Sequence, residues 1–350
     1  MKFIRLSLAI VLCLSVSVSE LSAQVVIRGE VVYTMDGPPI RDGIVVIRDG
    51  KISQVGPATE VVVPEGVEVL TGKVVTPGLI DSHSVVGLSG IFNVPADQDQ
   101  LEKSTPVQPE LRAIDAFNAD EELLDWIRGF GVTTIHTGHA PGELISGQTM
   151  IVKTTGTLDQ ESLLKETAAV AVTLSSEELK EGGKPPGTRG KSVAMLRSEL
   201  IRAREYSAKQ KAAADKPEAD RVARDLRLEV LSQVLNGEIA FMVTADKAQD
   251  IQSALRIADE FDLRLWLDSG SESFLVMDQL KAAKVPVLVH PTMARAVDVR
   301  ENLSFETAGR LRNAGITVCL QSGFEAYVPK TRVVLFEAGM AAANGLSFEQ

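Results

Sequence analysis

The stretch "TPGLIDSHSVVG", residues 76–87, has the residue types of a metal site on a predicted β-strand. Asp81 and His83 stand two positions apart, and alternate residues of a strand point to the same face. A carboxylate and an imidazole on one face are ordinary zinc ligands. The next residue on that face is Val85, whose hydrocarbon side chain cannot bind an ion. The stretch therefore predicts a metal site that has lost one ligand.

The chain has four histidines, so three others could contribute to such a site. His136 and His139 are three positions apart, which places them on opposite faces of an extended strand unless the chain turns at Gly138. His290 ends the predicted strand in "VPVLVHPT". We interpret His290 as a hydrogen-bonded residue at a strand end, and the pair as solvated loop residues.

Composition limits the class of protein. The 350 residues are 45% hydrophobic, enough for one large α/β barrel or about two or three smaller domains. The net charge of -11 argues against a basic surface for nucleic acid or for anionic lipid. We therefore predict a globular protein with no nucleic-acid partner.

Residues 1–23 are predicted to be a secretory signal peptide, because two basic residues precede a short apolar run that ends in small residues at Ala23. A membrane anchor and a lipoprotein attached at Cys13 are the alternatives. The run is too short to span a bilayer comfortably, and no other stretch approaches about 18 apolar residues, so no stable membrane span is expected. Removal of Cys13 leaves Cys319 alone, which excludes an internal disulfide. The predicted location is secreted or periplasmic.

Two patterns divide the rest of the chain. Residues 24–76 contain short β-rich runs broken by "DGPP", "RDG" and "PEG", which predicts part of a β-sandwich. Over residues 77–350 apolar strands alternate with helical segments, which predicts an α/β fold with a parallel barrel closed by its helices. A doubly wound open sheet is the alternative, although no nucleotide-binding glycine motif follows any strand. A charged segment around residues 190–236 predicts a helical pair outside the barrel.

The motifs "DGKISQVG", "KVVTPGLIDSH", "GVTTIH" and "DIQSALRIADEFDLRLWLDSG" occur in this order. In this combination the chain resembles the metal-dependent amidohydrolase superfamily, imidazolonepropionase-like branch. The resemblance implies a TIM-like (β/α)8 barrel with an N-terminal β-sandwich domain. It also implies hydrolysis of carbon–nitrogen bonds in cyclic amides or dipeptides, with zinc or a similar ion as cofactor. The family continues beyond "FEAGMAAANGLSFEQ", so part of the sandwich is expected to be missing and apolar surface uncovered.

The resemblance also indicates which strand ends would carry the site. Thr244 or Asp246 stands where the family has a histidine on the fifth strand, and Ser269 where it has one on the sixth. Ser322 stands where the eighth strand supplies the proton-accepting aspartate. We expect one pocket at the carboxyl ends of the strands, formed by Asp81, His83, Thr244, Asp246, Ser269 and Ser322. The metal site is predicted to be degenerate, with only His83 and Asp246 as ligand candidates.

The alternatives differ in function. We favour a non-catalytic or ligand-binding member, a pseudo-enzyme without a metal cofactor, that takes a small polar ligand and forms an oligomer or pairs with an active relative. A second hypothesis is an active hydrolase with a rearranged mononuclear site of His83, Asp246 and either His139 or His290. A third is an envelope-associated structural or interaction protein. A serine hydrolase is disfavoured because no serine lies in G-x-S-x-G.

Overall fold

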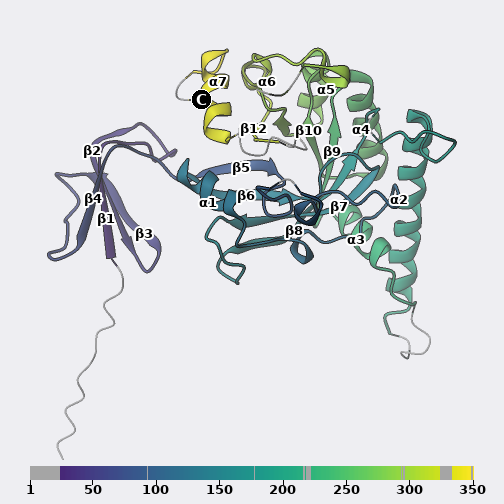
Figure 1. The fold of residues 1–350 in the computed structure, drawn as a ribbon, viewed down its shortest axis with the longest axis horizontal. Helices are drawn as coiled ribbons and strands as arrows, with labels where there is room; N and C mark the ends of the chain where they lie inside the picture. The colour runs from purple at the N-terminus through teal and green to yellow at the C-terminus, as the bar shows by residue number, and fades with distance from the viewer. Residues whose placement is uncertain are drawn as a thin grey trace, which may run out of the picture. The chain divides into compact units, whose positions relative to one another are not determined.

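The computed structural model describes residues 24–92, 94–176, 178–215, 217, 222–292, 294, 296–323, 333–347 and 350. The chain divides into two compact units, the first ending at Pro77 and the second spanning Gly78–Gln350 (Figure 1). Each unit has its own hydrophobic core. The predicted signal peptide, residues 1–23, lies outside the described residues.

The first unit contains a four-stranded sheet in the order β3-β2-β1-β4. Its strands are β1 (Gln24–Val32), β2 (Ile40–Arg48), β3 (Lys51–Pro57) and β4 (Glu68–Val75). Strand β1 runs antiparallel to β2 and parallel to β4. Because side chains alternate between the faces, Val26, Ile44 and Val46 lie together on one face and form the core of this unit.

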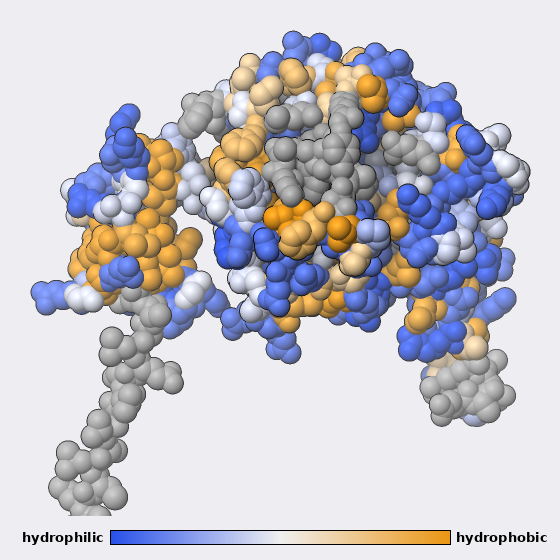
Figure 2. All heavy atoms as spheres, viewed as in Figure 1, coloured by the Kyte–Doolittle hydropathy of each residue, from blue (hydrophilic) through white to orange (hydrophobic). Residues whose placement is uncertain are grey.

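The opposite face of this sheet is also apolar but is exposed. Ile52 pairs with Ile47 across β3 and β2, and Ile52 is 66% exposed. Leu70 on β4 pairs with Ile27 and is 48% exposed. Figure 2 shows apolar side chains gathered on this unit. Apolar side chains on this face are therefore exposed.

The second unit is built on an eight-stranded sheet in the order β12-β11-β10-β9-β8-β7-β6-β5. The strands are β5 (Leu79–Ser84), β6 (Val132–Gly138), β7 (Ile145–Lys153), β8 (Leu163–Thr173), β9 (Ala240–Ala245), β10 (Leu265–Ser269), β11 (Val287–Val289) and β12 (Val318–Leu320). The first and last strands approach each other, since Ser82 Oγ donates to the carbonyl oxygen of Leu320 at 2.7 Å. The sheet is a nearly closed barrel, and the predicted fold class is confirmed.

The prediction that every barrel strand is parallel was wrong at β7, which runs antiparallel to both β6 and β8. The reason lies in the connections. Residues 139–144 and 154–162 join these strands, and both segments are shorter than the crossover of roughly a dozen or more residues that parallel neighbours need. Strands β6, β7 and β8 therefore form an antiparallel meander inside an otherwise parallel barrel.

Helices cover the barrel strands on their outer side (Figure 1). They are α1 (Glu122–Gly129), α2 (Arg189–Ala212), α3 (Leu226–Leu235), α4 (Ala248–Phe261), α5 (Met277–Ala282), α6 (Thr307–Asn313) and α7 (Val334–Ala343). The charged segment around residues 190–236 supplies α2 and α3. Leu196 and Leu200 of α2 are buried in the core, whereas Arg197 forms an ion pair with Glu260 of α4 at 2.8 Å. No described helix is both long and apolar enough to cross a bilayer.

Alternation along the barrel strands separates two apolar layers. Phe241 and Val243 of β9 belong to the large core shared with the outer helices. The intervening residue Met242 instead joins a small cluster made by strand residues alone, among them Ala171 and Leu288. This small cluster fills the barrel interior. Polar side chains on the same inward faces, nearer the carboxyl ends, form the candidate site.

Candidate functional site

Four polar side chains from four parts of the barrel meet at its centre: His83 on β5, Thr244 on β9, Asp268 on β10 and Gln321, which directly follows β12. The ring atom Nδ1 of His83 lies 2.9 Å from Asp268 Oδ1. Thr244 Oγ1 donates to Asp268 Oδ2 at 2.6 Å, and Gln321 Nε2 donates to Asp268 Oδ1 at 2.9 Å. We call these four residues the barrel-centre cluster, and Asp268 connects its members.

The cluster favours a buried ion pair. His83 and Asp268 are each only 2% exposed. Burial opposes the charged imidazole, but the carboxylates of Asp268 and, to a smaller extent, Asp81 together outweigh burial and raise the pKa of His83. Burial likewise works against the charged carboxylate, yet His83 and the hydroxyl and amide donors outweigh it and lower the pKa of Asp268. Both shifts favour an imidazolium beside a carboxylate. The second ring nitrogen of His83, Nε2, is buried and has no hydrogen-bond partner among the described residues.

Asp81 and Ser322 form a separate contact that joins β5 to the end of β12. Asp81 accepts from the backbone N–H of Ser322 at 3.0 Å, from the Ser322 hydroxyl, and from the N–H of His83 at 3.3 Å. Burial raises the pKa of Asp81 to about 6, although these hydrogen bonds oppose the shift. The Ser322 hydroxyl therefore fixes a buried carboxyl at the barrel seam.

Asp246, which directly follows β9, and Ser269, the last residue of β10, also pair with each other. Asp246 Oδ1 accepts from Ser269 Oγ at 2.7 Å and from the N–H of Ser271 at 3.0 Å. Its other oxygen lies 3.4 Å from Arg300 Nε. No contact between Asp246 and His83 is recorded in the described part of the chain. The structure thus brings the six predicted pocket residues to the strand ends in separate pairs and clusters.

The three remaining histidines are all buried. His136 Nδ1 pairs with the Ser82 carbonyl at 2.7 Å, and its ring lies 5.9 Å from that of His83, centre to centre. His139, just past β6, is 4% exposed, so the interpretation of this pair as solvated loop residues was wrong. The interpretation of His290 as a hydrogen-bonded strand-end residue is confirmed, because its Nε2 lies 3.0 Å from Thr307 Oγ1.

Sequence reasoning missed Asp268 and Gln321. It placed the sixth-strand group at Ser269 and the eighth-strand group at Ser322, one residue too late for the inward face in each case. The alternation of side chains between the two faces of a strand could have identified Asp268. Trp266 packs in the barrel interior, so Asp268, two residues later, shares its face. Ser269 instead has a positive φ of 71°, which places its backbone in the left-handed region.

The donor set does not fit the zinc site that the sequence resemblance implies. Hydrolytic zinc needs about three protein ligands and an open position. Asp268 already accepts from three side chains, and Asp81 from two residues. Val85 is a buried hydrocarbon side chain. Among the described residues, no three His, Cys, Asp or Glu side chains are grouped so that they could hold a metal ion.

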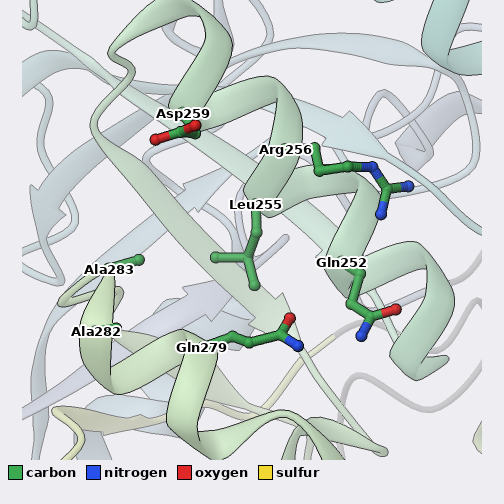
Figure 3. Close-up of a pocket in the computed structure, with 7 residues that line it drawn as sticks. All are labelled: Gln252, Leu255, Arg256, Asp259, Gln279, Ala282 and Ala283. Carbon is green, nitrogen blue, oxygen red and sulfur yellow. The ribbon is translucent and has the colours of Figure 1, made fainter.

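A groove lies away from this site, on the outer helices. It has a volume of about 580 Å³ and lies between α4 and α5, lined by Gln252, Leu255 and Arg256 on one side and by Gln279 and Ala282 on the other (Figure 3). None of these residues contacts the barrel-centre cluster in the described structure. This groove therefore contributes nothing to the candidate site.

Searches against protein-family models and curated protein sequences gave no match. Several solved structures are similar to this chain. An amidohydrolase from Thermotoga maritima MSB8 superposes with a TM-score of 0.85 at 24% identity, over 93% of this chain and 85% of that one. Molinate hydrolase superposes with a TM-score of 0.50 at 13% identity, over 92% and 80% of the two chains. At these identities the likeness shows a shared fold, a barrel with a separate small sheet.

Proposed function

We propose that this chain is an amidohydrolase-superfamily protein of the imidazolonepropionase-like branch that binds a small polar molecule without hydrolysing it at a resident metal. The observation that carries the proposal is the state of His83. Its Nδ1 is held by Asp268, while Nε2 is buried without a partner. A buried polar atom without a hydrogen bond is costly, so a bound ligand that supplies the missing partner is favoured.

The chemistry of the cluster indicates which ligand atom would lie beside His83. The raised pKa of His83 favours the protonated ring, in which Nε2 carries a hydrogen and donates. Its partner would then be an acceptor, such as a carbonyl or carboxylate oxygen. Cyclic amides and dipeptides carry such oxygens. The barrel's carboxyl ends are also where ligands bind in folds of this kind, which supports the placement.

The test combines metal analysis with binding. Full-length protein purified without chelator should contain less than one equivalent of zinc, manganese or nickel. It should bind hydantoin, a cyclic amide, or Gly-Pro, a dipeptide, without cleaving it when metal is added. His83→Gln keeps a donor for Asp268 but removes the free ring nitrogen, so affinity should fall about tenfold, roughly the effect of one buried hydrogen bond.

The matched control is His290→Gln, which removes an imidazole that already has its partners. It should leave affinity within about twofold of the unchanged protein. One tightly held ion per chain, together with metal-dependent cleavage of either probe, would overturn the proposal in favour of the rearranged hydrolase.

Export and partnership are further parts of the proposal. The residue pattern of residues 1–23 supports an extracytoplasmic location, and intact-mass analysis should find a mature chain that begins near Gln24. A member without its own metal chemistry could serve as a subunit of an active relative or of an oligomer. Size-exclusion chromatography with light scattering would detect the oligomer, and retention of Met1 in exported protein would contradict the export proposal.

A further inference from the structure

A second group of polar residues lines a cavity of about 300 Å³. Its walls come from residues 98–102 and 110–116, in the long segment between β5 and β6, and from His139 just after β6. Asp99, Glu102, Glu110, Asp115 and Arg112 line it together with His139. We call this space the His139 cavity. None of these residues bonds to a member of the barrel-centre cluster in the described structure.

His139 forms a wall of this cavity, and no described group donates a hydrogen bond to its ring. Neither Nδ1 nor Nε2 has a hydrogen bond of good geometry among the described residues. The Gln100 and Leu111 carbonyls are the polar groups that interact with the ring, and a carbonyl can only accept. Burial lowers the pKa of His139 to about 4, so the ring is neutral near pH 7 and always keeps one lone-pair nitrogen. That nitrogen needs a donor.

The position of the ring is fixed by Gly147 on β7. A Cβ atom at Gly147 would lie 2.3 Å from His139 Cδ2, and Gly147 has a φ of 141°, which other residues rarely adopt. The glycine leaves just enough room for the imidazole. His139 therefore packs directly against the backbone of β7, in space that any side chain at position 147 would occupy.

Apart from Arg112, the other charged groups that line the cavity are carboxylates, which accept hydrogen bonds. Glu110 Oε2 is buried without a hydrogen bond of good geometry, and it forms an ion pair with Arg227, whose Nε lies 3.6 Å away. Arg112 lies 2.6 Å from Glu166, outside the cavity, and 3.8 Å from Asp115. No ion pair is recorded for Asp99 or Glu102 in the described part of the chain. The cavity therefore has an excess of negative charge and of acceptors.

We infer that the His139 cavity binds a small organic ammonium ion. An ammonium group carries three N–H donors and a positive charge, and so complements both the acceptor atoms and the carboxylates of the walls. A cavity of this volume is at the small end of ligand sites, which suits a short alkyl amine. A bare divalent ion suits it less, because no described group of three His, Cys, Asp or Glu is placed to hold a metal. This site is independent of the proposed function.

The experiment uses the full-length chain labelled with ¹³C and ¹⁵N at histidine. With four histidines in the sequence, the ring signals can be assigned by single substitutions. The probe is 1,4-diaminobutane, with uncharged 1,4-butanediol as its matched control and calcium chloride as the test for a metal. The diamine should shift the His139 ring signals in a saturable way, and the diol should not. The combined change Asp99→Asn and Glu102→Gln should weaken diamine binding about tenfold, since it removes two nearby charges.

Two comparisons keep the test decisive. Glu205→Gln removes one carboxylate from the exposed face of α2 and should change diamine affinity less than twofold. His139→Phe keeps a ring beside Gly147, and a thermal melt establishes that the variant folds. A folded His139→Phe protein should bind the diamine at least fivefold more weakly. Equal binding of diol and diamine, unchanged affinity in the Asp99/Glu102 variant, or the same His139 shift from calcium alone would overturn the inference.

Discussion

Two regions of the barrel unit each bury a carboxylate, and their surroundings shift its pKa in opposite directions. In the barrel-centre cluster Asp268 lies 2.9 Å from the His83 imidazole, and its pKa is lowered. Near the start of α2, Glu178 is fully buried and accepts from the N–H of Ser175 at 2.7 Å and from the Ser192 hydroxyl at 3.1 Å. Burial raises the pKa of Glu178 to about 7.

The difference shows what keeps a buried acid charged. Each carboxylate has hydrogen bonds, so hydrogen bonding alone does not separate them. Asp268 has a partner that can carry a positive charge, whereas the recorded hydrogen-bond partners of Glu178 are uncharged and the nearby Asp250 repels its charge. Asp268 therefore belongs to an ion pair, whereas Glu178 is about half protonated near pH 7.

The largest effect should follow from removing Asp268. Asp268→Ala leaves His83, Thr244 and Gln321 without their shared acceptor and leaves a buried imidazole unpaired. We expect the free energy of unfolding to fall by about 3–5 kcal/mol, as for other buried pairs that lose one partner. Chemical denaturation at pH 7 measures this fall. Asp278→Asn on exposed α5 is the control and should cost less than about 0.5 kcal/mol. A cost below about 1 kcal/mol for Asp268→Ala would show that the cluster is not an ion pair.

Glu178→Gln should change how stability depends on pH. The folded-state pKa of about 7 is above the ordinary value of 4.5, so the folded protein holds the extra proton. The stabilisation from that proton is complete below about pH 4.5 and is lost as pH rises through about 7. The variant does not titrate; its amide oxygen can accept from the N–H of Ser175, and its amide nitrogen can donate to the Ser192 hydroxyl oxygen. Its stability relative to wild type should therefore rise by about 1–3 kcal/mol between pH 4.5 and 8.

Thermal or urea unfolding at several pH values measures this relative change. The control is Glu181→Gln, which replaces an exposed glutamate three residues later and should show a flat difference from wild type. A flat difference for Glu178→Gln as well would contradict the assigned pKa.

The smallest effect is expected for Thr244→Val, which removes one neutral donor from Asp268 and keeps the side-chain shape. The cost should be about 1–2 kcal/mol, because the carboxylate keeps its bonds to His83 and Gln321. Equilibrium denaturation of this variant and of Asp268→Ala under the same conditions compares the two losses in the free energy of unfolding. A Thr244→Val loss equal to that of Asp268→Ala would mean that the hydroxyl, not the imidazole, dominates the cluster.

The order of strands could be predicted from sequence, because apolar runs separated by turns and helical segments mark strands well. Strand direction at β7 could not be read from those runs, since parallel and antiparallel strands share the same alternation. The connections on either side of β7 could have indicated its direction, because they are too short for the crossover that parallel neighbours need.

The candidate site was only partly predictable. His83 could be placed from the strand pattern and Thr244 from the family resemblance, but the distances that join them to Asp268 depend on strands far apart in sequence. Asp268 lay beside the predicted Ser269, and a shift by one residue moves a side chain to the other face of a strand. His139 looked like a loop residue, and its burial results from packing against Gly147, which a sequence pattern does not show.

The antiparallel meander of β6, β7 and β8 also bears on how the chain folds. Its strands pair with neighbours joined by short segments, whereas the seam between β5 and β12 joins residues more than two hundred positions apart. Closing short loops costs less entropy than closing long ones, so local pairings form sooner. The meander should therefore gain protection from hydrogen exchange early in refolding, and the seam at Ser82 and Leu320 should gain it last.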